Sequence, residues 1–205
     1  DFRLLQEIYS QNEESRPIAQ IADKLHPWAA FIFAGSTFPK GYSSETGADM
    51  LLINAAADIN KPRGSLESLD DVTAIFKAQP EETMLNFLKA SIKTNKEETE
   101  DIKKLHQAYS DGRFEELIPL LEETEQRTLK LVDTKYAKAM SDWLKNDLLI
   151  RRNLAWLPEI HKQSAKQSTL FAVGIAHLPS EKGLIELLRQ EGYQVTPEPK
   201  VLIWQ

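Results

Sequence analysis

His177 is the residue whose type and position best suit chemistry. It follows the apolar run 170–175 and precedes a segment with helical spacing over about 181–190. Ligand sites in α/β proteins lie at the carboxyl ends of strands, and a neutral imidazole is a common metal ligand and a usable general base. Gly174 would let the backbone pass close to a neighbour or a ligand. The alternative is an ordinary loop histidine, and the spacing alone leaves both interpretations open.

Glu67 is a second candidate, since it is a carboxylate that follows a short turn containing Gly64. The pair Ser68 and Asp71 also forms a Ser-x-x-Asp helix start, where an acidic residue suits the positive end of the helix dipole. Glu67 therefore has two interpretations, a site carboxylate or a residue of a helix start.

Arg152 and Asn153 are the remaining candidates. The helix dipole is sufficient to explain two cations, Arg151 and Arg152, near the end of a long helical segment, but it does not explain Asn153. The sequence contains no His-Glu-x-x-His, P-loop, Gly-x-Ser-x-Gly or Gly-x-Gly-x-x-Gly motif, so the enzyme classes that depend on them lose support. The other histidines have structural interpretations: His26, His106 and His161.

The composition excludes several classes of function. The chain has 205 residues, of which 41% are hydrophobic and 27% charged, as in an ordinary globular protein. Its 25 basic and 31 acidic residues give a net charge of −6, which argues against a nucleic-acid partner. The lack of cysteine excludes disulfides, thiolate zinc sites and cysteine nucleophiles. No apolar run approaches the roughly 18 residues that a transmembrane helix requires.

The elements that must position the candidates are mostly helical. Apolar residues at helical spacing predict a helix over 47–57 and an all-helical middle over 68–165. Within that middle, residues 129–150 contain neither Gly nor Pro and predict one long helix that runs on toward Pro158. Residues 28–34 are apolar and aromatic, and their pattern fits a strand or a buried helix equally well.

Strands are expected mainly near the C-terminus. Residues 169–205 predict a β-α-β unit, whose crossover would make the flanking strands parallel. We therefore expect a single α+β domain over 1–205, helix-rich with a small mixed β-sheet. Its C-terminal unit would contain strands over 170–175, 193–195 and 201–204 and a helix over about 181–190.

Several short motifs, in this order and spacing, resemble the TraB/PrgY/GumN family, which also includes the Tiki proteases. The C-terminal segment is the most specific of them, and together they span most of residues 27–195. The motifs are Pro27-Trp28-Ala29-Ala30, Gly47-Ala48-Asp49, Gly64-Ser65-Leu66-Glu67-Ser68, Arg152-Asn153 with Trp156, and VGIAHLPSEKGLIELLRQEGYQV over 173–195.

The resemblance implies a metal-dependent hydrolase or peptidase, built on a mixed sheet wrapped by helices and related to erythromycin-esterase-like folds. A divalent metal ion would be the cofactor, and a peptide or small molecule the substrate. His177 would be a metal ligand, Glu67 a base or outer-shell carboxylate, and Arg152 or Asn153 an oxyanion or substrate contact. The resemblance also implies an extracytoplasmic location, with membrane attachment only through a segment outside this chain.

The chain departs from the family pattern in one respect. The family uses two Gly-x-x-His elements, and only the second, Gly174 to His177, is present. The segment from Gly35 to Phe38 has phenylalanine where the histidine belongs. We therefore expect an N-terminally incomplete domain or a member that has lost this element. A single histidine cannot hold a catalytic metal, because a catalytic zinc-type site takes about three protein ligands. Two alternatives stay open, a non-catalytic regulatory or binding protein on the same scaffold and a helical interaction module.

Overall fold

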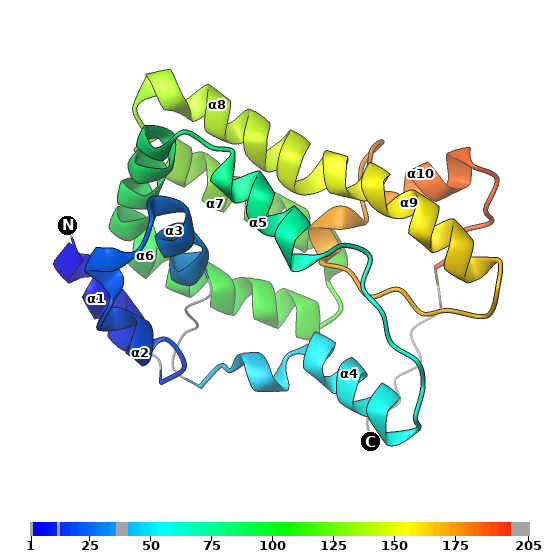
Figure 1. Ribbon diagram of the computed structural model, residues 1–205. Helices are drawn as coiled ribbons and strands as arrows, with labels where there is room; N and C mark the ends of the chain where they lie inside the picture. Colours follow the sequence, from blue (N-terminus) through cyan, green and yellow to red (C-terminus); the bar gives the residue numbers. More distant parts are fainter. Residues whose placement is uncertain (1, 12, 36–40, 198–205) are drawn as a thin grey trace. The chain divides into compact units, whose positions relative to one another are not determined.

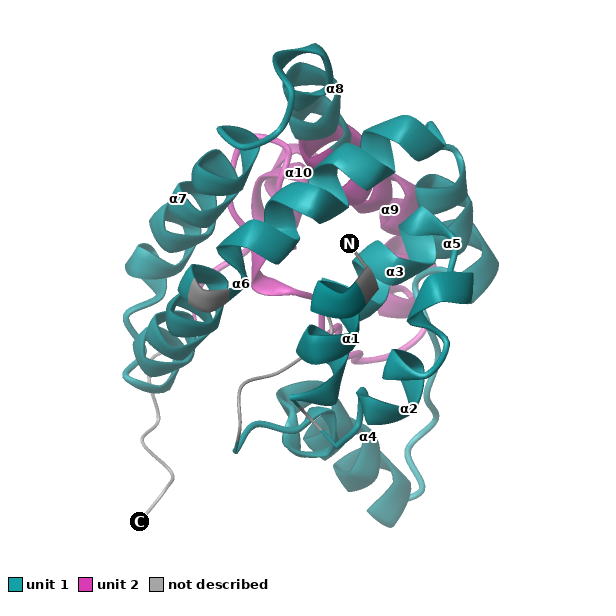
Figure 2. Ribbon diagram, turned by 90° about the vertical axis from the view of Figure 1, so that its left-hand side faces the viewer, with its two compact units in different colours: residues 1–143 teal, residues 144–205 magenta. Residues whose placement is uncertain are grey.

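The computed structural model describes residues 2–11, 13–35 and 41–197, and these residues form helices joined by turns and by segments without regular secondary structure (Figure 1). They divide into two compact units, residues 1–143 and residues 144–205 (Figure 2). The first unit contains α1 Phe2–Ser10, α2 Arg16–Ala19, α3 Pro27–Gly35, α4 Ala48–Asp58, α5 Leu69–Lys77, α6 Glu81–Ser110, α7 Leu117–Leu129 and most of α8 Thr134–Lys145, with short 3-10 turns at Ala22–Lys24, Ser44–Thr46 and Phe114–Glu116. The second contains a π-turn at Asn146–Ile150, α9 Arg151–Ser164, a 3-10 turn at Ile175–His177 and α10 Leu184–Gln190.

The expected α+β fold is wrong, because no strand occurs among the described residues. Residues 168–174 have no regular secondary structure. A strand exists only where a neighbouring strand accepts its backbone hydrogen bonds, and the described part of the chain supplies none. Leu170 is 73% exposed, so the run is not the buried strand that its apolar composition suggested. Residues 193–195 are also not a strand, and the expected strand over 201–204 lies outside the described residues.

The helical predictions are largely confirmed. The apolar segment at 28–34, whose pattern fitted a strand or a helix equally well, belongs to α3. The predicted all-helical region 68–165 contains α5 to α9. The predicted long helix begins later and ends later than expected. A turn at 130–133 separates α7 from α8, and the helical run from Thr134 then continues through the π-turn and past Pro158 to Ser164.

The core of the first unit lies where α1, α2, α3 and the first part of α6 meet. Leu5, Ile8, Ala30 and Leu88 are buried there. Tyr9 is fully buried, and its hydroxyl donates a 2.7 Å hydrogen bond to the carbonyl oxygen of Ala30. Burial raises the pKa of this hydroxyl to about 12, so Tyr9 is a neutral donor at physiological pH.

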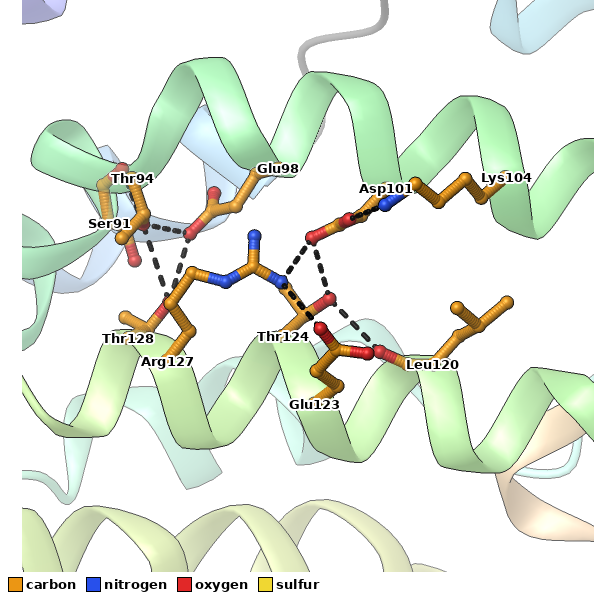
Figure 3. A network of polar contacts seen from close by, with 10 residues as sticks. All are labelled: Ser91, Thr94, Glu98, Asp101, Lys104, Leu120, Glu123, Thr124, Arg127 and Thr128. Carbon is orange, nitrogen blue, oxygen red and sulfur yellow. Dashed lines mark hydrogen bonds and ion pairs between the residues drawn. The ribbon is translucent and has the colours of Figure 1, made fainter.

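A polar network joins α6 to α7 (Figure 3). The carboxylate of Glu98 accepts hydrogen bonds from the hydroxyls of Thr94 and Thr128, at 2.5 and 3.1 Å. One turn further on, Asp101 lies 2.7 Å from the guanidinium of Arg127 and accepts from Thr124 at 3.0 Å. Thr94, Asp101 and Thr128 are buried and Glu98 is half-buried, so the partners of each carboxylate decide whether it stabilises or destabilises the fold.

Candidate functional site

The candidate site lies in the second unit and centres on His177, the last residue of the 3-10 turn Ile175–His177. The turn closes through a 2.9 Å hydrogen bond from the His177 backbone N–H to the carbonyl oxygen of Gly174. His177 is only 6% exposed, so its side chain is buried although it lies in a connecting segment.

Asn153 of α9 holds the imidazole in one orientation. The side-chain amide nitrogen of Asn153 donates to the carbonyl oxygens of Lys182 at 2.9 Å and His177 at 3.3 Å. Its oxygen, 2.7 Å from His177 Nδ1, is therefore an acceptor, and Nδ1 is the ring nitrogen that carries the hydrogen. In the neutral imidazole, Nε2 then carries the lone pair.

Arg152 and Trp156 complete the cluster. A guanidinium nitrogen of Arg152 lies 3.4 Å from His177 Nε2 and donates to the carbonyl oxygen of Leu148 at 3.1 Å. The guanidinium carbon lies 5.0 Å from the centre of the Trp156 ring, and that ring lies 4.5 Å from the imidazole, tilted by 44°. We refer to Arg152, Asn153, Trp156 and His177 as the His177 cluster.

Local sequence explains much of this geometry. Arg152 and Trp156 are four residues apart on α9, and Asn153 and Trp156 three apart, so their side chains share one side of the helix. The segment that returns from His177 to α10 is tight at Gly183, where a Cβ would lie 2.0 Å from the carbonyl oxygen of Pro179. Only glycine fits this close approach. The tight turn places the carbonyl oxygen of Lys182 within hydrogen-bond distance of the Asn153 side chain.

Three of the four predicted site residues thus lie together: Arg152, Asn153 and His177. The residue pattern does not indicate the carbonyl groups of Leu148 and Lys182 as partners, and it indicates Trp156 only as part of a family motif. Backbone carbonyls carry no residue-type signal, although the Gly183 position indicates a close approach. The π-turn that contains Leu148 has no recognisable sequence pattern.

Glu67, the fourth predicted residue, belongs to the first unit and precedes α5. The predicted helix start beside it is confirmed. The backbone N–H of Asp71 donates to the Ser68 hydroxyl at 3.1 Å, and the Ser68 N–H donates to the Asp71 carboxylate at 3.1 Å. Hydrogen bonds from the Ser68 side chain and backbone lower the pKa of Asp71. Glu67 itself is half-buried, and its role remains a prediction.

The described residues do not by themselves fit the expected divalent cation. Among them, no group of three or more His, Cys, Asp or Glu side chains is placed to hold a metal ion. The His177 cluster supplies one imidazole beside an amide, an indole and a guanidinium, whose positive charge opposes a cation near Nε2. A catalytic metal site needs about three protein ligands, so we derive no reaction step through a metal.

Comparison with known families decides the ancestry of the chain. The model of the TraB/PrgY/gumN family matches residues 1–197, which is nearly the whole sequence. The chain belongs to the TraB/PrgY/gumN family. No curated protein and no solved structure matches it. Among the residues that the structure describes in this TraB/PrgY/gumN protein, no helix is long and apolar enough to cross a membrane.

Proposed function

We propose that this chain is a hydrolase or peptidase of the TraB/PrgY/gumN family whose reaction uses the imidazole of His177. The observation that carries the proposal is the way the ring is held, with Nδ1 bonded to Asn153 at 2.7 Å and Nε2 turned toward Arg152. A buried imidazole held in one tautomer accepts a proton at a fixed atom, as general base catalysis requires.

The proposed reaction uses groups of the His177 cluster alone. His177 Nε2 takes a proton from water as the water oxygen attacks the carbonyl carbon of an ester or amide. Negative charge passes to the carbonyl oxygen, where the Arg152 guanidinium stabilises it. The imidazolium then gives its proton to the leaving oxygen or nitrogen as the bond to the carbonyl carbon breaks.

Arg152 must move slightly for this reaction. Its 3.4 Å separation from Nε2 is long for a hydrogen bond, so giving up this contact costs little. Protonation of His177 places two cations side by side, and an oxyanion bound between them offsets their repulsion. The stack on Trp156 and the bond to the Leu148 carbonyl keep the guanidinium close throughout.

The test is peptide and ester hydrolysis by the purified chain, measured on a fluorogenic peptide library and a panel of small esters. We expect His177→Ala to abolish turnover and His26→Ala, a change at an exposed histidine, to leave it intact. Circular dichroism and thermal unfolding show whether each variant is folded. Unchanged hydrolysis by folded His177→Ala contradicts the proposal.

Other properties implied by the family remain predictions. These are a base or outer-shell role for Glu67 and a peptide or small-molecule substrate. The family resemblance also implies a divalent cation with His177 as one ligand, and the described residues supply no group of three or more His, Cys, Asp or Glu side chains to complete such a site. An extracytoplasmic location, with membrane attachment only through a segment outside this chain, is a further prediction. A nucleic-acid partner is not expected.

A second candidate function is a non-catalytic binding or regulatory role on the same scaffold. The contacts of Asn153 favour it, because one buried amide ties both His177 and Lys182 to α9 and would do so in a purely structural cluster. This alternative predicts no hydrolysis by the wild-type chain on any substrate of the panel. It also predicts that folded His177 variants keep binding their partner, whereas substitutions on the surface helices between residues 80 and 150 weaken it.

A further inference from the structure

The indole N–H of Trp156 is a buried hydrogen-bond donor to which the described residues supply no acceptor. Trp156 is 4% exposed, and its Nε1 makes no hydrogen bond within the part of the chain that the structure describes. The great majority of buried polar groups in native proteins are paired, because an unpaired donor gives up its bond to water on folding and gains none in return. A buried donor of this kind is typical of a position at which a ligand or an ordered water supplies the acceptor.

Burial alone does not distinguish Trp156, because a second indole shares it. Trp143, in the first unit, is 2% exposed, and its Nε1 also has no partner among the described residues. The centre of the Trp143 ring lies 5.2 Å from that of Phe76 and 6.3 Å from that of Phe31. Aromatic faces are weak acceptors for N–H groups and offer no site for a polar ligand. Trp143 is therefore the reference for an indole that is buried by apolar packing.

The neighbours of Trp156 differ in kind, since they are the polar groups of the His177 cluster. The centre of its ring lies 4.5 Å from that of the imidazole and 5.0 Å from the guanidinium carbon of Arg152. A guanidinium and an indole N–H both donate and neither accepts, and the guanidinium also carries a positive charge. The group that suits both is an oxygen atom with negative charge, whereas a cation or another donor is disfavoured.

We propose that Trp156 is a substrate-binding residue, whose indole N–H donates a hydrogen bond to the carbonyl oxygen of the ester or amide. The assignment rests on the proposed function, because that reaction develops negative charge on this oxygen beside Arg152. The bond strengthens as the charge develops, so it stabilises the transition state more than the bound substrate. The N–H is buried in this structure, and the oxygen reaches it once the Arg152 side chain, which lies over the ring, has moved.

Replacement of Trp156 by phenylalanine tests the contact, because it keeps an aromatic ring and removes the N–H. For Trp156→Phe we expect kcat/KM to fall by about tenfold to a hundredfold, mainly through kcat, as on loss of an oxyanion donor. Trp143→Phe is the matched control, since it removes the other unpaired buried indole N–H, and we expect it to leave kcat/KM unchanged. Equal effects of the two folded variants overturn the inference.

Nuclear magnetic resonance of the wild-type chain tests the same contact without turnover and without a substitution at the site. With ¹⁵N-labelled tryptophan, each indole N–H of the four tryptophans gives its own signal, and Trp→Phe variants assign them. Methylphosphonate is the probe, because its tetrahedral anionic oxygens resemble those of the attacked carbonyl group. We expect a saturable shift of the Trp156 signal and none of the Trp143 signal. No shift at Trp156, or equal shifts at both, contradicts the inference.

The two measurements separate this contact from the proposed function. A saturable shift at Trp156 without hydrolysis by the wild type supports the oxygen contact and contradicts the hydrolase. Hydrolysis that requires His177 but is unchanged in folded Trp156→Phe supports the hydrolase and contradicts the contact.

Discussion

At the residue scale, the Asn153 side chain joins three polar groups of the second unit. It accepts from His177 Nδ1 and donates to two backbone carbonyls, and it is 2% exposed. Asn153→Ala leaves these groups buried without their partner, so we expect the free energy of unfolding to fall by about 2–4 kcal/mol. Urea unfolding followed by tryptophan fluorescence measures the change. Asn54→Ala, at an exposed position of α4, is the control, and equal stabilities of the two variants would contradict the assigned hydrogen bonds.

At the scale of the element, the α6–α7 pair contains two neighbouring carboxylates with opposite effects. Burial raises the pKa of Glu98 above its usual 4.5, although hydrogen bonds from Thr94 and Thr128 oppose the shift. Burial also pushes the pKa of Asp101 upward, but hydrogen bonds from Arg127, Thr124 and Lys104 outweigh it and leave the pKa below its usual 3.8. Ionised Glu98 therefore destabilises the fold and ionised Asp101 stabilises it.

These directions set the pH dependence of stability. The Glu98 contribution rises as pH falls through its raised pKa toward 4.5, whereas the Asp101 contribution is present above 3.8 and is lost as pH falls through its lowered pKa. At pH 7 we expect Glu98→Gln to stabilise the protein and Asp101→Asn to destabilise it by about 1–3 kcal/mol, because the contact between buried Asp101 and half-buried Arg127 is weakened. Urea unfolding of both variants at pH 7 checks these two signs. The same measurement from pH 4.5 to 8 checks the Glu98 contribution, which changes over that range, whereas the Asp101 contribution stays constant there. A Glu98→Gln variant that is less stable than wild type at pH 7 would show that the ionised carboxylate is a net stabiliser.

At the scale of the whole molecule, the described residues contain no group of three or more His, Cys, Asp or Glu side chains that could hold a metal ion, at His177 or elsewhere. We therefore expect the purified chain to bind zinc or manganese at well below one equivalent after dialysis, measured by elemental analysis. Stoichiometric, tightly bound metal that His177→Ala removes would contradict this expectation and support the metal-dependent mechanism that the family resemblance implies.

Helix type and many helix positions follow from local sequence. The apolar spacing in 47–57 and 68–165 predicts most of the observed helices, and the Ser68 helix start was read from two residues. The run at 28–34 shows the limit of periodicity. It is apolar on every side, and only the contacts with the other helices of the first unit make it α3.

The failed predictions all depend on partners distant in sequence. The run 168–174 has the composition of a strand, but a strand is defined by hydrogen bonds to another strand, which its own residues cannot supply. The prediction that the helix ends near Pro158 was also wrong. The buried side chains of Trp156, Leu157 and Ile160 hold α9 helical past the proline. Opposite shifts for Glu98 and Asp101, three residues apart on one helix, likewise depend on the α7 side chains beside them.

The sequence alone determined the family, the helical nature of most of the chain and three of the residues that meet in the His177 cluster. The tertiary structure decided that no sheet forms among the described residues and that His177 is buried with a fixed tautomer. It also decided that Nε2 lies beside a guanidinium instead of further metal ligands. The physical reason is the range of the interactions: helix propensity and capping act within about one turn, whereas strand pairing, burial and the partners of a buried imidazole depend on residues brought together from far along the chain.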